Sequence, residues 1–404
     1  MPGVALGMRN QILVGDAREQ LARIPDGSVQ CCVTSPPYFG LRDYGTAAWH
    51  GGDPECQHGV ERWDGPKQTQ GAQSGHSASR NRLNRLSCEC GAIKQDLQLG
   101  LESTPTEYVT SLVDVLRDVR RTLRHDGTLW LNLGDSYAND GKWGGRTSGK
   151  HAAGVHGKDT SIGRSKRNTG LKSKDLVGIP WMVAFALRDD GWYLRSDIIW
   201  AKGNCMPESV TDRPTKSHEY VFLLTKSQDY FYDQDAVREP ASVNKPWADS
   251  TNGGNKYAIT RGDCGRSTSL GKPADELRNR RTVWNINPKP YKGAHFAVMP
   301  EELASLCIKA GTSERGCCCK CGAPCHRTAP GCTCEAGIEP CLVLDPFSGA
   351  GTTAVTAARL GRAYLGVDLN SSYVELALKR LAPVLEARAQ QDVVNDLWDA
   401  TGKR

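Results

Sequence analysis

The fold is decided by the stretch Cys341-Leu342-Val343-Leu344-Asp345-Pro346-Phe347-Ser348-Gly349-Ala350-Gly351-Thr352-Thr353. It begins with a short apolar run typical of a buried strand, and its glycines allow a tight turn before a helix. A second apolar run ends at Asp368, whose carboxylate can accept hydrogen bonds from ribose hydroxyls. This order indicates an α/β sheet that binds an adenosine-containing cofactor. The glycine spacing alone does not separate nicotinamide from other adenosine cofactors.

A second loop, Thr34-Ser35-Pro36-Pro37-Tyr38, also follows a buried-strand pattern, at residues 29–34. Ligands of open α/β sheets bind outside the carboxyl ends of the strands, so the two loops can share one crevice. Methylation of an exocyclic amino group needs acceptors for its two N–H protons, and the Ser35 hydroxyl and the Pro36 carbonyl can supply them. The prolines stiffen the loop, and Tyr38 offers a ring for a base to stack on. By itself this loop would be an ordinary proline-rich turn, but beside the glycine loop it indicates a catalytic segment.

In this order the two loops resemble those of the β-class DNA amino-methyltransferases, the N4-cytosine/N6-adenine family. That class carries the catalytic loop first, the target-recognition region in the middle and the S-adenosylmethionine loop last. The resemblance covers most of the chain. It implies a Rossmann-like, S-adenosylmethionine-dependent methyltransferase sheet in a single permuted domain, residues 1–404. Serine before Pro-Pro-Tyr resembles the N4-cytosine branch, with N6-adenine methylation as the close alternative.

The resemblance also assigns site residues by position. The catalytic residues would be Ser35, Pro36, Pro37 and Tyr38. The cofactor would be held by segment 341–382 through Asp345, Pro346, Phe347, Ser348, Gly349, Gly351, Thr352, Thr353 and Asp368. Further cofactor contacts would come from Asp16 at the adenine and from His295 and Phe296 at the methionine end. Trp200, Lys202, Asn204 and Glu219 lie in segments similar to those that border the family's target-base pocket.

The implied reaction is direct transfer of a methyl group to the amino nitrogen of a cytosine that has rotated out of double-stranded DNA onto Tyr38. No cysteine nucleophile is needed. Pro340-Cys341 precedes the glycine loop as a strand start, which weighs against a C5-cytosine enzyme. The motif order weighs against a protein or RNA methyltransferase. A non-catalytic zinc-containing DNA-binding protein is a further alternative, but it would leave Asp345 and Asp368 without a purpose.

Composition agrees with a DNA partner. The 404 residues carry a net charge of +6, and basic residues gather in two polar stretches. Residues 139–175, which include Lys142 and Arg146, have the composition of a basic flexible loop that follows phosphates. Residues 241–281 form a candidate target-recognition region with Arg278, Arg280 and Arg281 near its end. Either stretch could instead be a solvated excursion.

The amino end has no charged and apolar leader, and no apolar run approaches the roughly 18 residues of a membrane span. We therefore expect a soluble, cytoplasmic protein with no membrane partner, and the family resemblance implies a restriction-modification system of prokaryotic or phage type. Cytosolic thiols stay reduced, so the 16 cysteines favour metal binding over disulfides.

Two groups of cysteines have the spacing of metal ligands. An insertion at 50–100 contains Cys56 and His58 with Cys88 and Cys90, and a second insertion at 312–340 contains Cys318 and Cys321 with Cys332 and Cys334. Four soft ligands with no open position suit structural zinc. Other cysteines crowd the second group, which leaves its ligand set open. The alternative for the first group is a disordered insertion with incidental cysteines.

The middle of the chain holds scaffold elements. Thr104-Pro105-Thr106-Glu107 is a capping box that predicts a helix up to Gly127, followed by a strand at 128–133. Asp135 follows that strand, where it is either functional or the cap of a nearby helix. His218 is expected to be structural rather than a catalytic base.

Overall fold

The computed structural model describes residues 8–40, 44, 46–56, 58, 88, 90–138, 169–205, 207–240, 277–289, 298–326 and 331–401. Its centre is an eight-stranded sheet. In spatial order the strands are β1 (Gln11–Val14), β14 (Ala363–Asp368), β13 (Leu342–Asp345), β2 (Val29–Thr34), β5 (Leu123–Leu133), β7 (His218–Thr225), β6 (Tyr193–Ala201) and β10 (Val283–Asn285). All neighbours are parallel except β7, which runs antiparallel to both β5 and β6.

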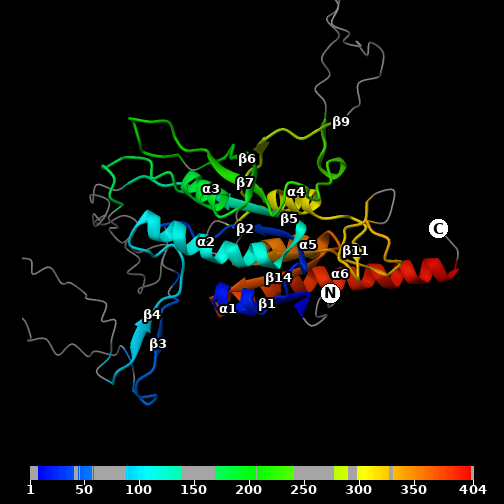
Figure 1. Cartoon of the computed structure of the whole chain (residues 1–404), viewed down its shortest axis with the longest axis horizontal. Coiled ribbons are helices and arrows are strands. Elements are labelled where there is room, and N and C mark those ends of the chain that lie inside the picture. The colour runs from blue at the N-terminus through cyan, green and yellow to red at the C-terminus, as the bar shows by residue number, and fades with distance from the viewer. Residues whose placement is uncertain are drawn as a thin grey trace, which may run out of the picture.

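Helices cover both faces of this sheet, which gives the predicted α/β fold (Figure 1). One face carries α1 (Ala17–Ala22), α2 (Pro105–Thr122) and α3 (Ile179–Asp189). The other carries α4 (Glu301–Gly311), α5 (Thr352–Arg359) and α6 (Ser371–Thr401). Strands buried on both faces have near-continuous apolar sequences, which is why the runs at β2 and β13 could be recognised.

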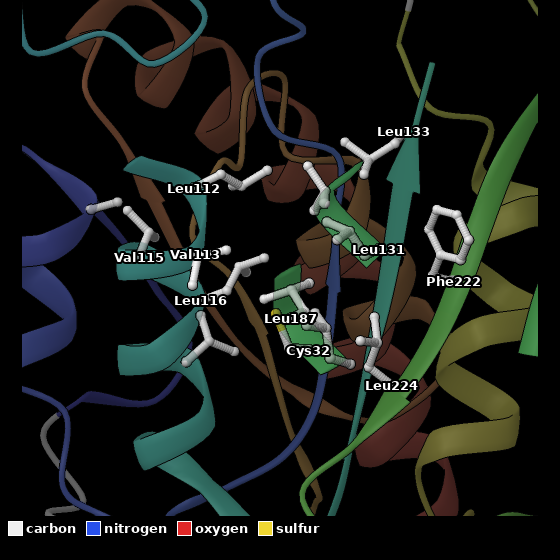
Figure 2. Packing of buried hydrophobic residues seen from close by; sticks show 14 of the residues in the cluster. Cys32, Leu112, Val113, Val115, Leu116, Leu131, Leu133, Leu187, Phe222 and Leu224 are labelled. Carbon is white, nitrogen blue, oxygen red and sulfur yellow. The ribbon is translucent and has the colours of Figure 1, made fainter. Parts of the chain in front are cut away.

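Successive side chains of strand β5 point to opposite faces of the sheet and pack into different hydrophobic clusters. Leu129, Leu131 and Leu133 join the cluster under α2 and α3, whereas Trp130 joins the cluster under α4. Figure 2 shows Leu112 and Leu116 of α2 lying opposite Leu131 of this strand. Because the strand is buried on both sides, its polar residues have to find partners inside the protein.

The two ends of the chain meet at the centre of the sheet. Val343 and Leu344 of β13 pair in parallel with Cys31 and Cys32 of β2. Both strands therefore end at the same edge, and the loops that follow them lie side by side. The permuted motif order thus produces a continuous sheet.

The border between α2 and β5 differs from the sequence prediction. Thr104 caps the helix as expected, with its hydroxyl accepting from the Glu107 backbone N–H at 3.2 Å. The helix ends at Thr122 instead of continuing to Gly127, because Leu123 is extended and already pairs with Val29 of β2. Leu123 occupies an apolar helical position but is buried as part of a strand, so periodicity alone was misleading.

Short strands build three smaller two-stranded sheets. Strands β3 (Ala48–His50) and β4 (Ile93–Gln95) form a hairpin that projects from the body (Figure 1). Strand β8 (Glu239–Pro240) follows the 3-10 helix Asp235–Val237 and pairs with β9 (Leu277–Arg278), and β11 (Cys317–Cys318) pairs with β12 (Ile338–Glu339). Among the described helices, none combines the length and apolar character needed to cross a bilayer.

Candidate active site

The loop after β2 and the loop after β13 are joined by hydrogen bonds. The Thr34 hydroxyl donates to Asp345 Oδ1 at 2.7 Å, and the Thr353 hydroxyl donates to the Val33 carbonyl at 3.1 Å. Thr34 and Asp345 are almost fully buried, so the contact is shielded from water. These bonds fix the catalytic-type loop against the cofactor-type loop at one edge of the sheet.

A cleft of about 730 Å³ opens at this edge. That size is typical of sites for cofactors and other small molecules. The predicted site residues that line it are Asp16, Ser35, Pro36, Pro37, Tyr38, Asp345, Pro346, Phe347, Ser348, Gly349, Thr352 and Asp368. Residues predicted from both ends of the chain therefore surround a single space.

The glycine loop forms a cradle in this cleft. Gly349 and Gly351 have φ values of +50° and +74°, which disfavour any residue with a Cβ atom. Gly351 caps the start of α5, and a Cβ there would lie 2.6 Å from Ala377 Cβ. The buried Ser348 hydroxyl oxygen has no hydrogen-bond partner within the described part of the chain. The loop thus holds a buried polar atom that has no partner among the described residues, beside a backbone that a ligand can approach closely, which fits a cofactor of the S-adenosylmethionine type.

Three carboxylates occupy the cofactor side of the cleft. Asp368 accepts from the backbone N–H groups of Gly349, at 2.7 Å, and Asn370, at 2.9 Å. Asp16 caps α1 by accepting from the Arg18 N–H at 2.8 Å. Burial raises the pKa of Asp368 above its usual value and that of Asp345 to about 6. Asp16 and Asp368 are both at the cleft surface, and each carboxylate has further lone pairs for ribose or adenine donors.

On the other side of the cleft, Tyr38 belongs to a hydrogen-bonded group. Its hydroxyl donates to Glu219 Oε2 at 2.7 Å and accepts from Asn132 Nδ2 at 3.0 Å. Burial, reinforced by the Glu219 charge, raises the pKa of Tyr38 well above its usual value, so the phenol stays neutral. Gly134 lies against the ring, and a Cβ there would be 2.5 Å from Tyr38 Cε2. The tyrosine is therefore held in one orientation.

Asn132 is the group's central donor, and the sequence analysis missed it. Its Nδ2 lies 3.3 Å from Ser35 Oγ and 3.0 Å from Glu219 Oε2. The Asn132 side chain is oriented with its amide nitrogen toward these acceptors. Its buried Oδ1 therefore has no hydrogen-bond partner among the described residues. The available signal was a polar residue inside the otherwise apolar run Leu129-Trp130-Leu131-Asn132-Leu133. A lone polar side chain in a doubly buried strand points to a site.

Glu219 has a third partner in Lys202. The Lys202 ammonium forms an ion pair with Glu219 Oε1 and lies 4.2 Å from the centre of the Trp200 ring. Trp200, Lys202, Asn204 and Glu219, from segments at β6 and β7, all line the cleft. Their position agrees with the target-base border that the family resemblance implied.

Asp135 and His218 both line the cleft, and each also has a structural contact. Asp135 accepts from the backbone N–H groups of Gly178, at 3.0 Å, and Ile179, at 3.2 Å, so it caps the start of α3. Of the two alternatives for Asp135, the structure shows the capping contact. His218 packs edge-on against Tyr220, with ring centres 5.3 Å apart. The structural role of His218 stays a prediction.

The structure assembles both predicted metal-ligand groups. The ligand atoms of Cys56, His58, Cys88 and Cys90 lie within 4.8 Å of one another. The same holds for Cys318, Cys321, Cys332 and Cys334, which singles out these four from the crowded cysteines around them. Backbone N–H groups of Cys321 and Lys320 lower the pKa of Cys318 to about 6, and the Ala92 N–H lowers the pKa of Cys90. Each group thus brings four soft donor side chains together, a donor set that suits zinc.

Several predicted site residues lie outside this description or have partners within the protein. His295, Phe296, Lys142 and Arg146 lie outside the described residues. The predicted DNA contacts Arg278 and Arg281 both pair with Glu239, at 3.0 and 2.6 Å, and Arg280 donates to the Val237 carbonyl at 2.8 Å. Glu239 therefore balances part of the positive charge of this arginine cluster.

The chain resembles known proteins over most of its length. A family model described as N6_N4_Mtase, DNA methylase, matches residues 29–379. The chain belongs to this DNA methylase family. It is an S-adenosylmethionine-dependent DNA methyltransferase of the N4/N6 amino-methyltransferase type.

Relatives match this methylase along most of its length. The type II methyltransferase M.SmaI of Serratia marcescens is 39% identical over 92% of this chain and 90% of its own. The type II methyltransferase M.XycI of Xanthomonas campestris pv. cyanopsidis is 40% identical over 91% and 86%, respectively. A solved structure titled PvuII DNA methyltransferase (cytosine-N4-specific) is 15% identical, with a TM-score of 0.48 over 91% of this chain and 85% of its own.

Proposed function

We propose that this methylase transfers the methyl group to the N4 amino group of a cytosine flipped out of double-stranded DNA, within a restriction-modification system. The observation that carries the proposal is the position of Ser35. It follows β2 directly, lines the cleft and lies 3.3 Å from Asn132 Nδ2. A serine here, where aspartate or asparagine would suit the adenine branch, favours cytosine.

The residues around the cleft suggest how the base is oriented. The Ser35 hydroxyl and the Pro36 carbonyl accept the two N4–H protons, which frees the nitrogen lone pair from conjugation with the ring. Tyr38, held by Glu219 and Asn132, packs against the base. Bound S-adenosylmethionine supplies an electrophilic methyl group, so positioning provides most of the acceleration. N4 forms the new bond to the methyl carbon as the carbon–sulfur bond breaks, and the nitrogen then loses a proton to solvent or a neighbouring acceptor.

Identification of the product tests the choice of base. Duplex DNA is incubated with the methylase and S-adenosylmethionine, digested to nucleosides and analysed by mass spectrometry. We expect N4-methylcytosine. N6-methyladenine as the product would overturn the cytosine assignment while leaving the family intact, and mapping of the modified positions would identify the recognition sequence.

We also propose that each four-ligand group binds one structural zinc ion. The donors are three thiols and one imidazole in one group and four thiols in the other, with no position left open for water. Metal analysis of stringently desalted protein should find two zinc ions per chain. A folded and active protein without zinc would exclude both sites.

A further inference from the structure

The hairpin of β3 and β4 is too small to hold itself together. Its ladder joins three residue pairs, from Ala48 with Gln95 to His50 with Ile93. Isolated two-stranded hairpins are at best marginally stable in water. Ile93 is 59% exposed, so the ladder gains little stability from the burial of this apolar residue. Some other contact has to keep its two legs together.

The base of the hairpin forms a wall of the cofactor cleft. Tyr44 and Thr46, ahead of β3, and Gln98, after β4, line the cleft beside Asp368 and Tyr373. The ring of Tyr44 meets that of Tyr373 edge-on, with centres 6.0 Å apart. Tyr373 follows shortly after Asp368, the predicted ribose acceptor. The hairpin therefore contributes an aromatic side chain to the adenosine end of the cleft.

Hydrogen bonds between the legs hold this wall in place. The Tyr44 backbone N–H donates to Gln98 Oε1 at 2.7 Å, and the Thr46 hydroxyl donates to Asp96 Oδ1 at 2.8 Å. Asp96 Oδ1 also accepts from the Gln98 N–H at 3.1 Å. Each contact from Tyr44 and Thr46 crosses from one leg to the other, so the wall forms only while the legs stay in register.

The first metal-ligand group closes the other end of the hairpin. Cys56 and His58 come from the leg after β3, and Cys88 and Cys90 come from the leg before β4. The legs approach so closely here that a Cβ on Gly52 would lie 2.6 Å from the Ala92 backbone nitrogen and 2.7 Å from Cys90 Sγ. A metal bound by all four ligands would join the legs across the 29 residues that separate His58 from Cys88.

We propose that zinc at Cys56, His58, Cys88 and Cys90 sets the affinity of this methylase for S-adenosylmethionine, by holding the hairpin that carries Tyr44, Thr46 and Gln98. The proposal rests on the function proposed above and adds a role for one of its two zinc ions. Without that zinc, the legs are joined mainly by the three-pair ladder and the hydrogen bonds of Tyr44 and Thr46 at the base of the hairpin. S-adenosylmethionine then has to order Tyr44, Thr46 and Gln98 when it binds. The conformational entropy lost in that ordering lowers its affinity.

The second metal-ligand group provides a matched control within the same chain. None of its four cysteines lines the cleft. It lies instead by the starts of β2 and β5, where Arg124 hydrogen-bonds the Cys321 carbonyl and Gln30 Nε2 donates to the Gly322 carbonyl at 3.4 Å. The cleft is at the opposite ends of these strands, so zinc at the second group should not affect cofactor affinity.

The experiment compares Cys56→Ser, Cys88→Ser and Cys321→Ser in the full chain. Zinc content is measured by mass spectrometry, S-adenosylmethionine binding by calorimetry and folding by thermal melting. We expect Cys56→Ser and Cys88→Ser each to lose one zinc and to weaken cofactor binding about tenfold, the equivalent of ordering roughly one residue. Cys321→Ser should lose one zinc with cofactor affinity unchanged. Equal affinity in all three variants, or equal loss in all three, would overturn the proposal.

Tyr44→Ala provides a second test that leaves every zinc ligand intact. It should keep two zinc ions and bind S-adenosylmethionine more weakly, and adding Cys56→Ser should then cause little further loss. Full affinity in Tyr44→Ala would refute the proposed link between the hairpin and the cofactor even if the cysteine variants fail to fold. Wild-type protein that carries zinc but shows no saturable S-adenosylmethionine binding would instead contradict the proposed function itself.

Discussion

Ser35 and Ser348 are two serines in one cleft with different surroundings. Ser35 Oγ lies near the amide of Asn132, on the side of the predicted target base. Ser348 Oγ is buried in the glycine loop, on the cofactor side. The same change at each position can therefore separate an effect on methyl transfer from an effect on cofactor binding.

Ser35→Ala should lower kcat by about 100-fold or more, because a preorganised hydrogen-bond partner of the reacting group is removed. Its affinity for S-adenosylmethionine should stay unchanged. Ser348→Ala, the control, should instead weaken S-adenosylmethionine binding. Single-turnover methylation and calorimetry measure the two effects. A fully active Ser35→Ala variant would remove this hydroxyl from the mechanism.

The buried Asp345 should make stability depend on pH. Burial raises its pKa from 3.8 to about 6, so the folded protein holds this proton more tightly than the unfolded chain. Its contribution to the free energy of unfolding therefore falls as pH rises from about 4 to 6 and stays low above that range. Asn at this position keeps an oxygen that can accept from Thr34 and the Phe347 N–H.

Asp345→Asn should thus raise the melting temperature at pH 8 more than at pH 4, where the wild-type carboxyl is already protonated. Thermal melts of both proteins across this range measure the difference. A constant difference between them would mean that Asp345 titrates at its ordinary pKa. The expected sign does not depend on cofactor binding, because the melts are recorded without S-adenosylmethionine.

At the scale of elements, the turn from β13 into α5 combines backbone strain with close packing. Gly349 and Gly351 both have positive φ, yet a Cβ on Gly349 would have open space, with the Phe347 carbonyl oxygen nearest at 4.0 Å. A Cβ on Gly351 would lie against Ala377 of α6. The turn therefore determines how closely α5 and α6 pack.

Gly349→Ala should destabilise the protein by about 1–2 kcal/mol, the cost of a left-handed conformation for an L-residue. Gly351→Ala should cost about 1–3 kcal/mol more, because the added methyl group overpacks the contact with α6. Urea denaturation measures both free energies of unfolding. Equal losses in the two variants would show that α6 shifts freely and that packing at Ala377 does not constrain the turn.

At the scale of the whole molecule, the cleft lies at one edge of the sheet, where β2 and β13 end. The cleft lies at the carboxyl end of β2, whereas the end of α2 lies near the start of β5, which follows it directly. Arg117, near the end of α2, pairs with Asp190 at 2.6 Å and provides a control charge that does not line the cleft. Lys142 and Arg146 lie outside the described residues, and their contact with DNA phosphates remains a prediction.

The Lys142→Ala/Arg146→Ala double variant should weaken DNA binding and reduce the slope of log affinity against log salt by about two. Arg117→Ala should leave that slope unchanged. Fluorescence anisotropy with duplex DNA at several salt concentrations measures both. A double variant with the wild-type slope would show that the 139–175 segment does not follow the DNA backbone.

The amino-acid sequence by itself determined the strands that end in the two site loops, their permuted order and the two cysteine-rich segments, whereas the structure selected the four ligands of the second one. These features depend on residue type and short spacing, which a local pattern records. The tertiary structure alone showed that Asn132 joins Ser35, Tyr38 and Glu219, that Asp135 caps α3 and that the hairpin base lines the cleft. These depend on contacts between segments far apart in the chain, where burial and hydrogen-bond geometry, rather than local residue pattern, determine which groups become partners.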